Sequence, residues 1–371
     1  MTSRLAGTLL PAHGGQLRAI AAQFSVPEHK LLDFSASIYP GGPSPHVLEA
    51  LADAIRNPAS IRAYPDLESL ELRKNLANYV NVPVGNVLVA NGMVPLLSAT
   101  LRAIGVRKCM LPAPAFGEYS RALHRDGVTI ETSRLTEEAN FRPDIIELLA
   151  RCARRGCDTL ILTNPHNPTG AILQRADLQV LVRNAETCGI RILLDEAFID
   201  FVPEESVSAR VLQSSNLFVF RSVTKFFGMA GVRVAYMIAP QPLVSAIADR
   251  LDPWAISTLA SLAAIAAVSD TVYIANAIVG NRHEREMLSV ELAALGLTVY
   301  PSQANFLFFR LSNARRNRNV WERLILKHGI VVRNCAMFEG LDEMYFRVAV
   351  RSREDNQRFV RALYAVLNDV A

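Results

Sequence analysis

Short apolar runs alternate with helix-length amphipathic stretches between residues 45 and 240. Stretches such as 142–156 and 175–189 carry helical periodicity and end on glycine, as helix C-caps often do. Continuous apolar strands separated by helices predict an α/β fold, with a mostly parallel sheet covered on both faces. The runs that we interpret as buried strands are residues 86–91, 108–114, 158–164, 190–197, 216–222 and 232–239.

The pattern changes after about residue 240. Long helical stretches occupy residues 243–295, and strand-like runs follow them at 298–311, 331–337 and 344–352. Helices that are followed by strands, rather than alternating with them, are typical of an α+β arrangement. The sequence therefore predicts a second, smaller α+β domain after the α/β part.

Composition places the chain among ordinary globular proteins. Of its 371 residues, 50% are hydrophobic and 20% are charged, which excludes wholesale disorder and fibrous architectures. The net charge of +4 is too small and too dispersed to indicate a nucleic-acid partner. Five cysteines without a CxxC pair or zinc-ligand spacing predict a reduced, cytoplasmic protein without a metal site.

Neither the N-terminus nor the interior predicts a membrane-bound protein. The first 15 residues lack the long apolar run and cleavage site of a secretory signal. The best candidate for a membrane span is 254–281, where Asp270 is the only charged residue. Asp270 interrupts the stretch before about 20 apolar residues accumulate, and its first half is rich in Ala and Ser. We expect a buried, closely packed helix there, and no membrane partner.

Two charged residues at the ends of predicted strands are candidates for catalysis. Asp195 closes one strand, and open α/β sheets bind ligands at the carboxyl ends of their strands. Lys225 follows another strand and is flanked by two phenylalanines, which disfavour its charged form and make the amine a better nucleophile. Ser222 and Arg233, on either side of Lys225, supply a hydroxyl and a fixed cation suited to a phosphate group.

Two turns at strand ends complete the set of candidate segments. In TNPHNPTG, residues 163–170, two prolines and a glycine fix a turn that presents Asn164 and Asn167. In NGMVPL, residues 91–96, Gly92 joins a strand to a helix whose first N–H groups form an anion site. Each turn alone is common in proteins, so the argument depends on their combination with Asp195 and Lys225.

In order and spacing, NPHNPTG, DEAFIDF and SVTKFFGMAGVR resemble the fold-type I pyridoxal-phosphate (PLP) enzymes of the aminotransferase class I/II superfamily. The resemblance extends from HGG at 13–15 and RAYPD at 62–66 to FRVAVRSREDN near the C-terminus. It implies a large PLP-binding domain at 42–240 with a mostly parallel seven-stranded sheet. It also implies a small α+β domain that is formed by residues 1–41 and 241–371 together.

The resemblance implies a role for each cofactor-binding residue. Lys225 would bind PLP covalently through a Schiff base, and Asp195 would pair with the protonated pyridine nitrogen, so that the ring acts as an electron sink. Asn167 would bind the ring hydroxyl oxygen, and Phe116 would stack on the ring. The expected phosphate ligands are the backbone amides of Gly92 and Met93, the side chains of Ser222 and Arg233, and Tyr64 from the neighbouring subunit of a homodimer.

Within the superfamily, the chain resembles the L-threonine O-3-phosphate decarboxylases of cobalamin biosynthesis, and next the histidinol-phosphate aminotransferases. Three features are similar to the decarboxylases: AHGG followed by LLDFSAS, Phe198 where aminotransferases usually carry tyrosine, and the tail at 331–356 with Arg351. The implied reaction is decarboxylation of L-threonine O-3-phosphate to (R)-1-aminopropan-2-yl phosphate. The alternatives are a histidinol-phosphate type of aminotransferase, or a divergent PLP enzyme that acts on another amino acid.

A phosphorylated amino acid carries two anions, and the resemblance implies a separate arginine for each. Arg333 would bind the substrate phosphate and Arg347 the α-carboxylate. His13, Ser37 and Asn167 would also lie near the substrate. Arg351 is either a further member of this set or a structural salt-bridge partner.

Two segments depart from the decarboxylase pattern. Those relatives usually read SANINPLG where this chain reads SASIYPGG, so that Ser37 and Tyr39 replace two asparagines near the substrate. They also read NGETES where this chain reads NGMVPL, and Pro95 offers no N–H to a phosphate. The departures lie near the substrate and in the phosphate turn, and they leave Lys225, Asp195, Ser222 and Arg233 in place.

Overall fold

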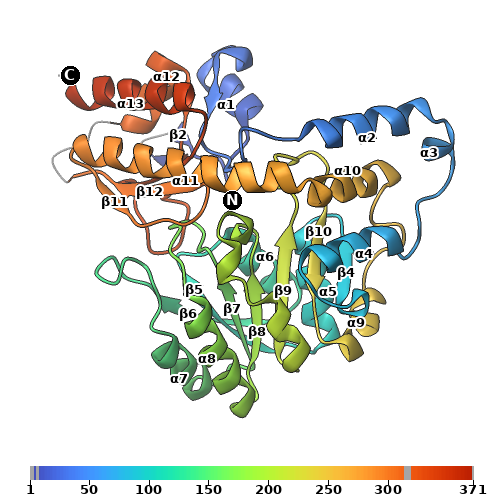
Figure 1. Cartoon of the computed structure of the whole chain (residues 1–371). Coiled ribbons are helices and arrows are strands. Elements are labelled where there is room, and N and C mark those ends of the chain that lie inside the picture. Colours follow the sequence, from blue (N-terminus) through green and yellow to red (C-terminus); the bar gives the residue numbers. More distant parts are fainter. Residues whose placement is uncertain (1–3, 6–7, 313–318, 370–371) are drawn as a thin grey trace.

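The computed structural model describes residues 4–5, 8–312 and 319–369. Within these residues, a seven-stranded sheet forms the lower half of the molecule, in the order β4-β10-β9-β8-β7-β5-β6 (Figure 1). β10 runs antiparallel to both of its neighbours, whereas β9, β8, β7, β5 and β6 are parallel to one another. The strands are β4 (Val87–Ala90), β5 (Lys108–Ala113), β6 (Thr129–Arg134), β7 (Thr159–Thr163), β8 (Arg191–Asp195), β9 (Leu217–Ser222) and β10 (Ala235–Ile238).

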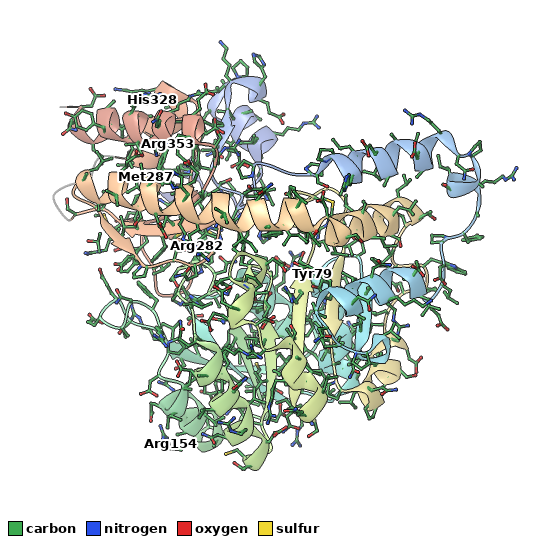
Figure 2. The ribbon with its side chains drawn as sticks, viewed as in Figure 1. Tyr79, Arg154, Arg282, Met287, His328 and Arg353 are labelled. Atoms are coloured by element: carbon green, nitrogen blue, oxygen red, sulfur yellow. The ribbon has the colours of Figure 1, made fainter. Side chains whose placement is uncertain are left out.

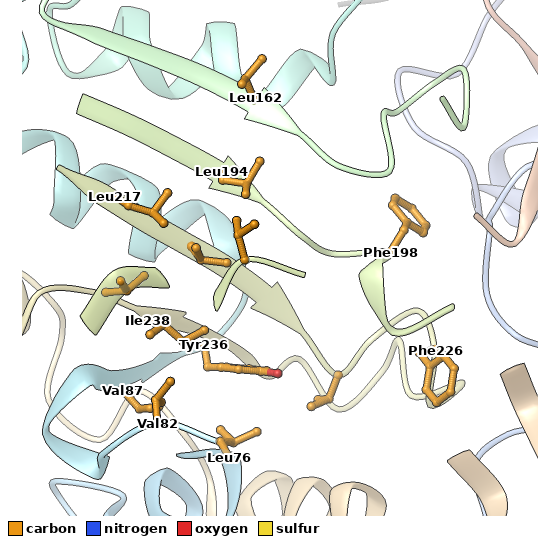
Figure 3. Close-up of a cluster of buried hydrophobic side chains, with 14 of the residues drawn as sticks. Leu76, Val82, Val87, Leu162, Leu194, Phe198, Leu217, Phe226, Tyr236 and Ile238 are labelled. Carbon is orange, nitrogen blue, oxygen red and sulfur yellow. The ribbon is translucent and has the colours of Figure 1, made fainter. Parts of the chain in front are cut away.

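The alternation of side chains along each strand explains the two covered faces. Leu160, Leu162, Ile192 and Leu194 pack in one buried cluster with α4, α7, α8 and α10. The intervening residues, such as Leu193, pack in another cluster with α5, α6 and α9. Figure 3 shows the first cluster, with Leu162, Leu194, Leu217 and Ile238 on successive strands. The predicted α/β fold with a mostly parallel sheet is confirmed.

Helices cover both faces of this sheet and form most of the upper half. Their ends follow local sequence signals: Asp144 caps α7 by accepting hydrogen bonds from the backbone of Ile146 and Glu147, and the chain leaves this helix through Gly156 at φ 65°. The helices are α1 (Leu17–Phe24), α2 (Pro45–Arg56), α3 (Ala59–Arg62), α4 (Leu70–Tyr79), α5 (Met93–Ala103), α6 (Gly117–Arg125), α7 (Ile145–Arg154), α8 (Arg175–Thr187), α9 (Gln241–Ala248), α10 (Thr258–Ser269), α11 (Thr271–Ala294), α12 (Val320–His328) and α13 (Arg353–Asn368). Short 3₁₀ helices are η1 (Glu28–Lys30), η2 (Val84–Asn86), η3 (Ile199–Phe201), η4 (Pro203–Glu205) and η5 (Ser208–Gln213).

A smaller antiparallel sheet lies in the upper half, in the order β11-β12-β15-β14. One of its faces packs under α1, α11, α12 and α13, and the other carries Tyr300, Phe308 and Tyr345 toward the large sheet. The strands are β11 (Thr298–Tyr300), β12 (Phe306–Arg310), β14 (Arg333–Asn334) and β15 (Tyr345–Ala349). Two short pairs join the N-terminal segment: β1 (Arg4–Leu5) with β2 (Thr8–Leu9), and β3 (Leu32–Asp33) with β13 (Ile330–Val331).

The long helix α11 runs across the molecule between the two halves (Figure 1). Arg282, which is labelled in Figure 2, lies 3.9 Å from Glu204 of the lower half. α9 and α10 pack against the large sheet, although they follow residue 240. The division into domains at 1–41, 42–240 and 241–371 stays a prediction.

Asp270 separates the two helices that lie in the predicted apolar stretch. Its side chain accepts a hydrogen bond from the backbone N–H of Tyr273 at 3.0 Å, and so caps α11. Among the described residues, no single helix is both long and apolar enough to cross a membrane. α10 and α11 meet the length and composition criteria only as a pair, and they are bent by 72° at Asp270.

Candidate active site

The candidate residues gather at the carboxyl edge of the large sheet. Thr163 and Asp195 are register partners at the ends of β7 and β8, so their side chains lie on the same face. The backbone N–H of Asn164 donates to the carbonyl of Asp195 at 2.8 Å and continues the pairing into the asparagine turn. Ser222 ends the neighbouring strand β9. This is the edge at which open α/β sheets bind ligands.

Asp195 is a buried carboxylate that two donors hold in place. Its Oδ1 accepts a hydrogen bond from the backbone N–H of Ala197 at 2.8 Å, and its Oδ2 accepts one from the hydroxyl of Tyr119. That hydroxyl also lies 2.9 Å from Oγ1 of Thr163. Burial raises the pKa of Asp195 to about 6, although both hydrogen bonds lower it. Because burial removes the water that would stabilise its negative charge, the Asp195 carboxylate would be stabilised by a bound cationic group.

Lys225 lies in the loop after β9, where apolar residues and other cations surround it. Burial, and after it the positive charges of Arg347 and Arg233, lower the pKa of Lys225 to about 8, although Asp195 opposes this shift. The carbonyl of Lys225 accepts a hydrogen bond from the backbone N–H of Tyr39 at 2.9 Å. A lysine with this pKa has a neutral, nucleophilic amine for a substantial part of the time at neutral pH.

The glycine turn at the start of α5 faces Arg233. Gly92 has a φ of +96°, and a Cβ built at this position would lie 2.8 Å from Nη2 of Arg233. Met93 begins α5, so that its free backbone N–H points out of the helix end. Ser222 Oγ accepts from the backbone N–H of Thr224 at 3.1 Å and donates to the carbonyl of Val234 at 3.5 Å, a long bond that a bound phosphate could replace. The turn, the arginine and the serine together form a site suited to a phosphate group.

Arg347 and Arg333 are register partners on β15 and β14, so they share the face of the small sheet that points to the large sheet. Arg347 donates to Oδ1 of Asn167 at 2.5 Å and to the carbonyl of Ser35 at 3.1 Å. Its Nε has no partner among the described residues, and burial lowers the pKa of Arg347 to about 10. No carboxylate neutralises this buried guanidinium through an ion pair within the described part of the chain. An anionic ligand would supply the missing charge.

The N-terminal segment that contains HGG lies next to β14 and α6. Arg333 donates to the carbonyls of Pro11 at 2.5 Å and Ala12 at 2.7 Å, and so fixes the segment next to β14. His13 Nε2 lies 3.0 Å from Oε1 of Glu118, and its ring is 6.0 Å from that of Phe116. The structure therefore brings His13 to the residue predicted to stack on the cofactor.

The remaining predicted residues lie in different surroundings. Ser37 is buried, and its Oγ has no partner among the described residues. Tyr64 is 82% exposed and its ring contacts Trp254, so this chain alone does not bring it to the phosphate turn. Arg351 binds Oδ2 of Asp355 at 2.9 Å and the carbonyl of Asp33 at 3.1 Å. Of the two interpretations of Arg351, these contacts are those of the structural one.

The sequence did not single out Tyr119, although this residue touches Asp195. Its position three residues after Phe116 places it on the same side of α6, which starts at the sheet edge. The T-shaped contact between the two rings, with centroids 5.6 Å apart, shows that they form one wall. A buried tyrosine needs a partner for its hydroxyl, and that requirement is the signal that could have found it.

A nucleophilic lysine, a buried carboxylate and a phosphate-binding turn at this edge of the fold define a fold-type I PLP-dependent enzyme. The residues present fit PLP: the Gly92 turn leaves a space that a Cβ would fill, and Ser37 and Arg347 keep unpartnered polar atoms. Among the described residues, no three His, Cys, Asp or Glu side chains gather as a metal site.

Comparison with known proteins assigns the family. The model of aminotransferase class I and II matches residues 29–363, and the chain belongs to this family, whose cofactor is PLP. A threonine-phosphate decarboxylase from Salmonella typhimurium is 34% identical over 97% of this chain and 98% of its own. A histidinol-phosphate aminotransferase from Methanosarcina mazei is 31% identical over 94% of this chain and 92% of its own.

A solved structure agrees with this assignment. The histidinol-phosphate aminotransferase from Clostridium acetobutylicum has a TM-score of 0.84 and is 31% identical, over 92% of this chain and all of that one. The predicted superfamily, fold and PLP cofactor are confirmed. Because both kinds of relative are similar to nearly the whole chain, family membership alone leaves the reaction to be argued from the site.

Proposed function

We propose that the chain decarboxylates L-threonine O-3-phosphate to (R)-1-aminopropan-2-yl phosphate, as a lyase of cobalamin biosynthesis in the cytoplasm. The observation that carries the proposal is the pair Arg333 and Arg347, which lie opposite each other on one face of the small sheet. Cβ atoms of opposite residues in antiparallel strands are about 5 Å apart. Two arginines on one face could bind the two anions of L-threonine O-3-phosphate, a phosphate and a carboxylate on neighbouring carbons.

Bound PLP supplies an electron sink for the bond at Cα that stands perpendicular to its ring. Contacts between the protein and the substrate determine which bond at Cα takes this orientation. Arg347 is fixed by Asn167 and by the carbonyl of Ser35, and in this proposal its remaining N–H groups hold the substrate carboxylate out of the ring plane. Arg333 holds the phosphate, so that the substrate is bound at two points and has little freedom to rotate.

Lys225 and Asp195 have separate tasks in the proposed reaction. Asp195 Oδ2 binds the ring nitrogen and keeps its proton in place, while Asn167 and Phe116 hold the ring oxygen and the ring face. Carbon dioxide would leave as a neutral molecule while its bonding electron pair stays with Cα, and Lys225 Nζ would donate the proton that bonds to Cα. With a pKa near 8, this amine exchanges protons readily at neutral pH.

A histidinol-phosphate type of aminotransferase remains the second candidate, because a relative of that name is 31% identical to the chain. One side chain argues against it. Phe198 takes the position where aminotransferases usually carry tyrosine, and its ring packs against Phe306 with centroids 5.0 Å apart. No hydroxyl is present there to bind the ring oxygen.

We also propose that the enzyme is a homodimer whose partner supplies Tyr64. Further apolar side chains are exposed on α2, α3 and the start of α4, which are the elements next to Tyr64 in the chain, and on Trp254, whose ring contacts Tyr64. A second copy of the chain would cover them. The same partner would place the Tyr64 hydroxyl at the phosphate group. These apolar residues are Leu48, Ile55, Ile61, Leu67, Leu70 and Trp254.

The test is the stoichiometry of the reaction. Purified protein with PLP and L-threonine O-3-phosphate should release one carbon dioxide per substrate in the absence of any 2-oxo acid. Conversion that requires 2-oxoglutarate and leaves the carboxylate in place would establish the aminotransferase instead. Sedimentation of the PLP-loaded protein measures the subunit number in the same preparation.

A further inference from the structure

The loop between β6 and α7 crosses from the large sheet to the small one. Oε1 of Glu137 in this loop accepts a hydrogen bond from the hydroxyl of Tyr300 at 2.5 Å, and Oε2 accepts one from the hydroxyl of Tyr345 at 2.8 Å. Nη1 of Arg310 lies 3.9 Å from the same carboxylate. One charged side chain of the lower half is thus bound to β11, β12 and β15 of the upper half.

A second residue of this loop strengthens the contact. The ring of Phe141 meets Tyr300, Phe308 and Tyr345 edge-on, with centroid distances of 5.2, 5.4 and 6.0 Å. The loop is closed on itself, because the backbone N–H of Phe141 donates to the carbonyl of Thr136 at 2.8 Å. Glu137 and Phe141 therefore act on the small sheet from one compact turn, which Figure 1 shows below β11 and β12.

The strand register connects this contact to the two arginines. Tyr300 pairs with Phe308, Phe308 with Arg347, and Arg347 with Arg333, so these four residues form one row across the sheet. Tyr345 precedes Arg347 by two positions and lies on the same face. Its ring is stacked on Phe308, with centroids 5.4 Å apart and planes at 8°. Glu137 therefore binds one end of the row that carries Arg347 and Arg333 at its other end.

We propose that Glu137 is a positioning residue that fixes Arg347 and Arg333 relative to the cofactor site. Its carboxylate touches neither substrate nor PLP. It holds the aromatic half of the row, and the arginine half then faces the carboxyl edge of the large sheet. The inference rests on the proposed function only in assigning the substrate carboxylate to Arg347.

A carboxylate is the group that this position requires. Two phenol hydroxyls donate to it and a guanidinium stands beside it, so both oxygens act as acceptors. A glutamine has one acceptor oxygen and one donor nitrogen, and it places no negative charge beside Arg310 from this position. Hydrogen bonds to a charged acceptor contribute more than neutral ones, so Glu137→Gln should loosen the row without removing side-chain volume.

The experiment compares Glu137→Gln with Glu138→Gln, a matched change at the exposed neighbouring residue. Stopped-flow cofactor absorbance, read before turnover, gives the affinity of each holoenzyme for L-threonine O-3-phosphate. Equilibrium titration gives its affinity for 1-aminopropan-2-yl phosphate, the same molecule without its carboxylate. The preference for the carboxylate-bearing ligand should fall roughly ten-fold in Glu137→Gln and stay unchanged in Glu138→Gln. PLP content should be equal in all three proteins, because Lys225 and Asp195 are untouched.

Tyr345→Phe is the second variant, since it keeps the stacked ring and removes only the hydroxyl. It should shift the same preference in the same direction by a smaller factor. Unchanged preferences in both variants, with a lower Tm alone, would reduce Glu137 to a structural role and overturn the proposal. Failure of the proposed function has a different signature: the unaltered protein does not respond to L-threonine O-3-phosphate. The same comparison is then made with an amino acid that it does bind and the corresponding amine.

Discussion

The hydroxyl of Tyr119 donates its proton to Oδ2 of Asp195, and so joins the end of β8 to the first turn of α6. Phe116 is the N-cap residue of the same helix, so one helix start holds both the residue predicted to stack on the ring and the partner of the carboxylate. Burial raises the pKa of Asp195 and the hydrogen bond from Tyr119 lowers it. Tyr119 therefore opposes the cost of keeping this carboxylate charged in the interior.

Tyr119→Phe removes that hydrogen bond and retains the ring. The pKa of Asp195 should rise further above its ordinary value, so the acid limb of the kcat/KM profile should move to higher pH. We expect kcat at pH 7 to fall by about ten-fold, the scale of one hydrogen bond to a charged group. The pH profile of the purified holoenzyme measures both effects.

Thr163→Val is the control for this change. It removes the other partner of the Tyr119 hydroxyl and leaves the bond to Asp195 intact. Its acid limb should stay in place. An equal shift in both variants would show that Tyr119 acts through packing rather than through its proton.

Asp195→Asn should make the cofactor-free protein more stable at neutral pH and the enzyme less active. The pKa of Asp195 is higher in the folded chain than in the unfolded one, so protonation of Asp195 favours folding. This contribution to the free energy of unfolding is fully present at pH values below the ordinary pKa of aspartate, and it is lost as pH rises through about 6. Asparagine carries no charge to bury. Its amide can donate to the hydroxyl of Tyr119, which then donates to Thr163. The cofactor-free variant should therefore be more stable at pH 7, by roughly 1–3 kcal/mol.

Chemical denaturation of the two cofactor-free proteins across the pH range checks this sign. The difference in free energy of unfolding should shrink as pH falls from about 6 to about 4. Activity of Asp195→Asn should drop roughly 10²–10³-fold, the scale of one preorganised electrostatic contact in an active site. A variant that is less stable than the parent at pH 7 would contradict the assigned cause of the pKa shift.

The large sheet could be predicted from the sequence because its strands are buried on both faces. All six predicted runs are strands, and each reads as continuous apolar sequence. β6 was missed, because it lies at the edge of the sheet and its residues Thr129–Arg134 are mostly polar. Only Ser133 of β6 is buried, so neither a hydrophobic run nor alternation identifies this strand, whereas β4 at the other edge is buried throughout and was predicted.

Site residues could be predicted where the chemistry requires one residue type in a motif. They could not be predicted where the role depends on a side chain that contacts a second element of the fold. Lys225, Asp195 and Arg347 stand out by motif, and the fold brings them together. Tyr119 and Glu137 carry no motif, since each acts through a hydroxyl or carboxylate that must span two elements. Such contacts depend on the packing of α6 and of the β6–α7 loop, which local sequence does not encode.

Lys225 should react with PLP at a pH well below that of an ordinary lysine. The reactive form is the neutral amine, and burial lowers the pKa of Lys225 to about 8. The rate of PLP incorporation into the cofactor-free protein should rise with pH up to about 8 and level off above it. Stopped-flow absorbance across this range gives the midpoint, and a midpoint near 10 would contradict the assigned environment.

Two variants identify the lysine that is responsible. Lys225→Ala should lose the absorbance of covalently bound PLP, and an unchanged spectrum would disprove the assignment of this residue. Lys74→Ala changes an exposed lysine on α4, which lies 3.7 Å from Glu71. Its spectrum and midpoint should match those of the parent protein.

Gly92→Ala should weaken PLP binding much more than it weakens folding. The backbone at Gly92 has a φ of +96°, and the added Cβ would lie 2.8 Å from Nη2 of Arg233. Either the turn shifts or the guanidinium moves away, and both changes spoil the phosphate site.

Gly105→Ala is the matched control at the other end of α5, because its φ is also positive and nothing lies within 4 Å of the added Cβ. We expect the Kd for PLP to rise roughly 10–100-fold in Gly92→Ala, as about 1–3 kcal/mol of strain would produce. In Gly105→Ala the Kd should be unchanged, with a stability loss of about 1 kcal/mol. Fluorescence titration of the cofactor-free proteins measures the Kd, and equal affinities in the two variants would show that the Gly92 turn does not hold the phosphate.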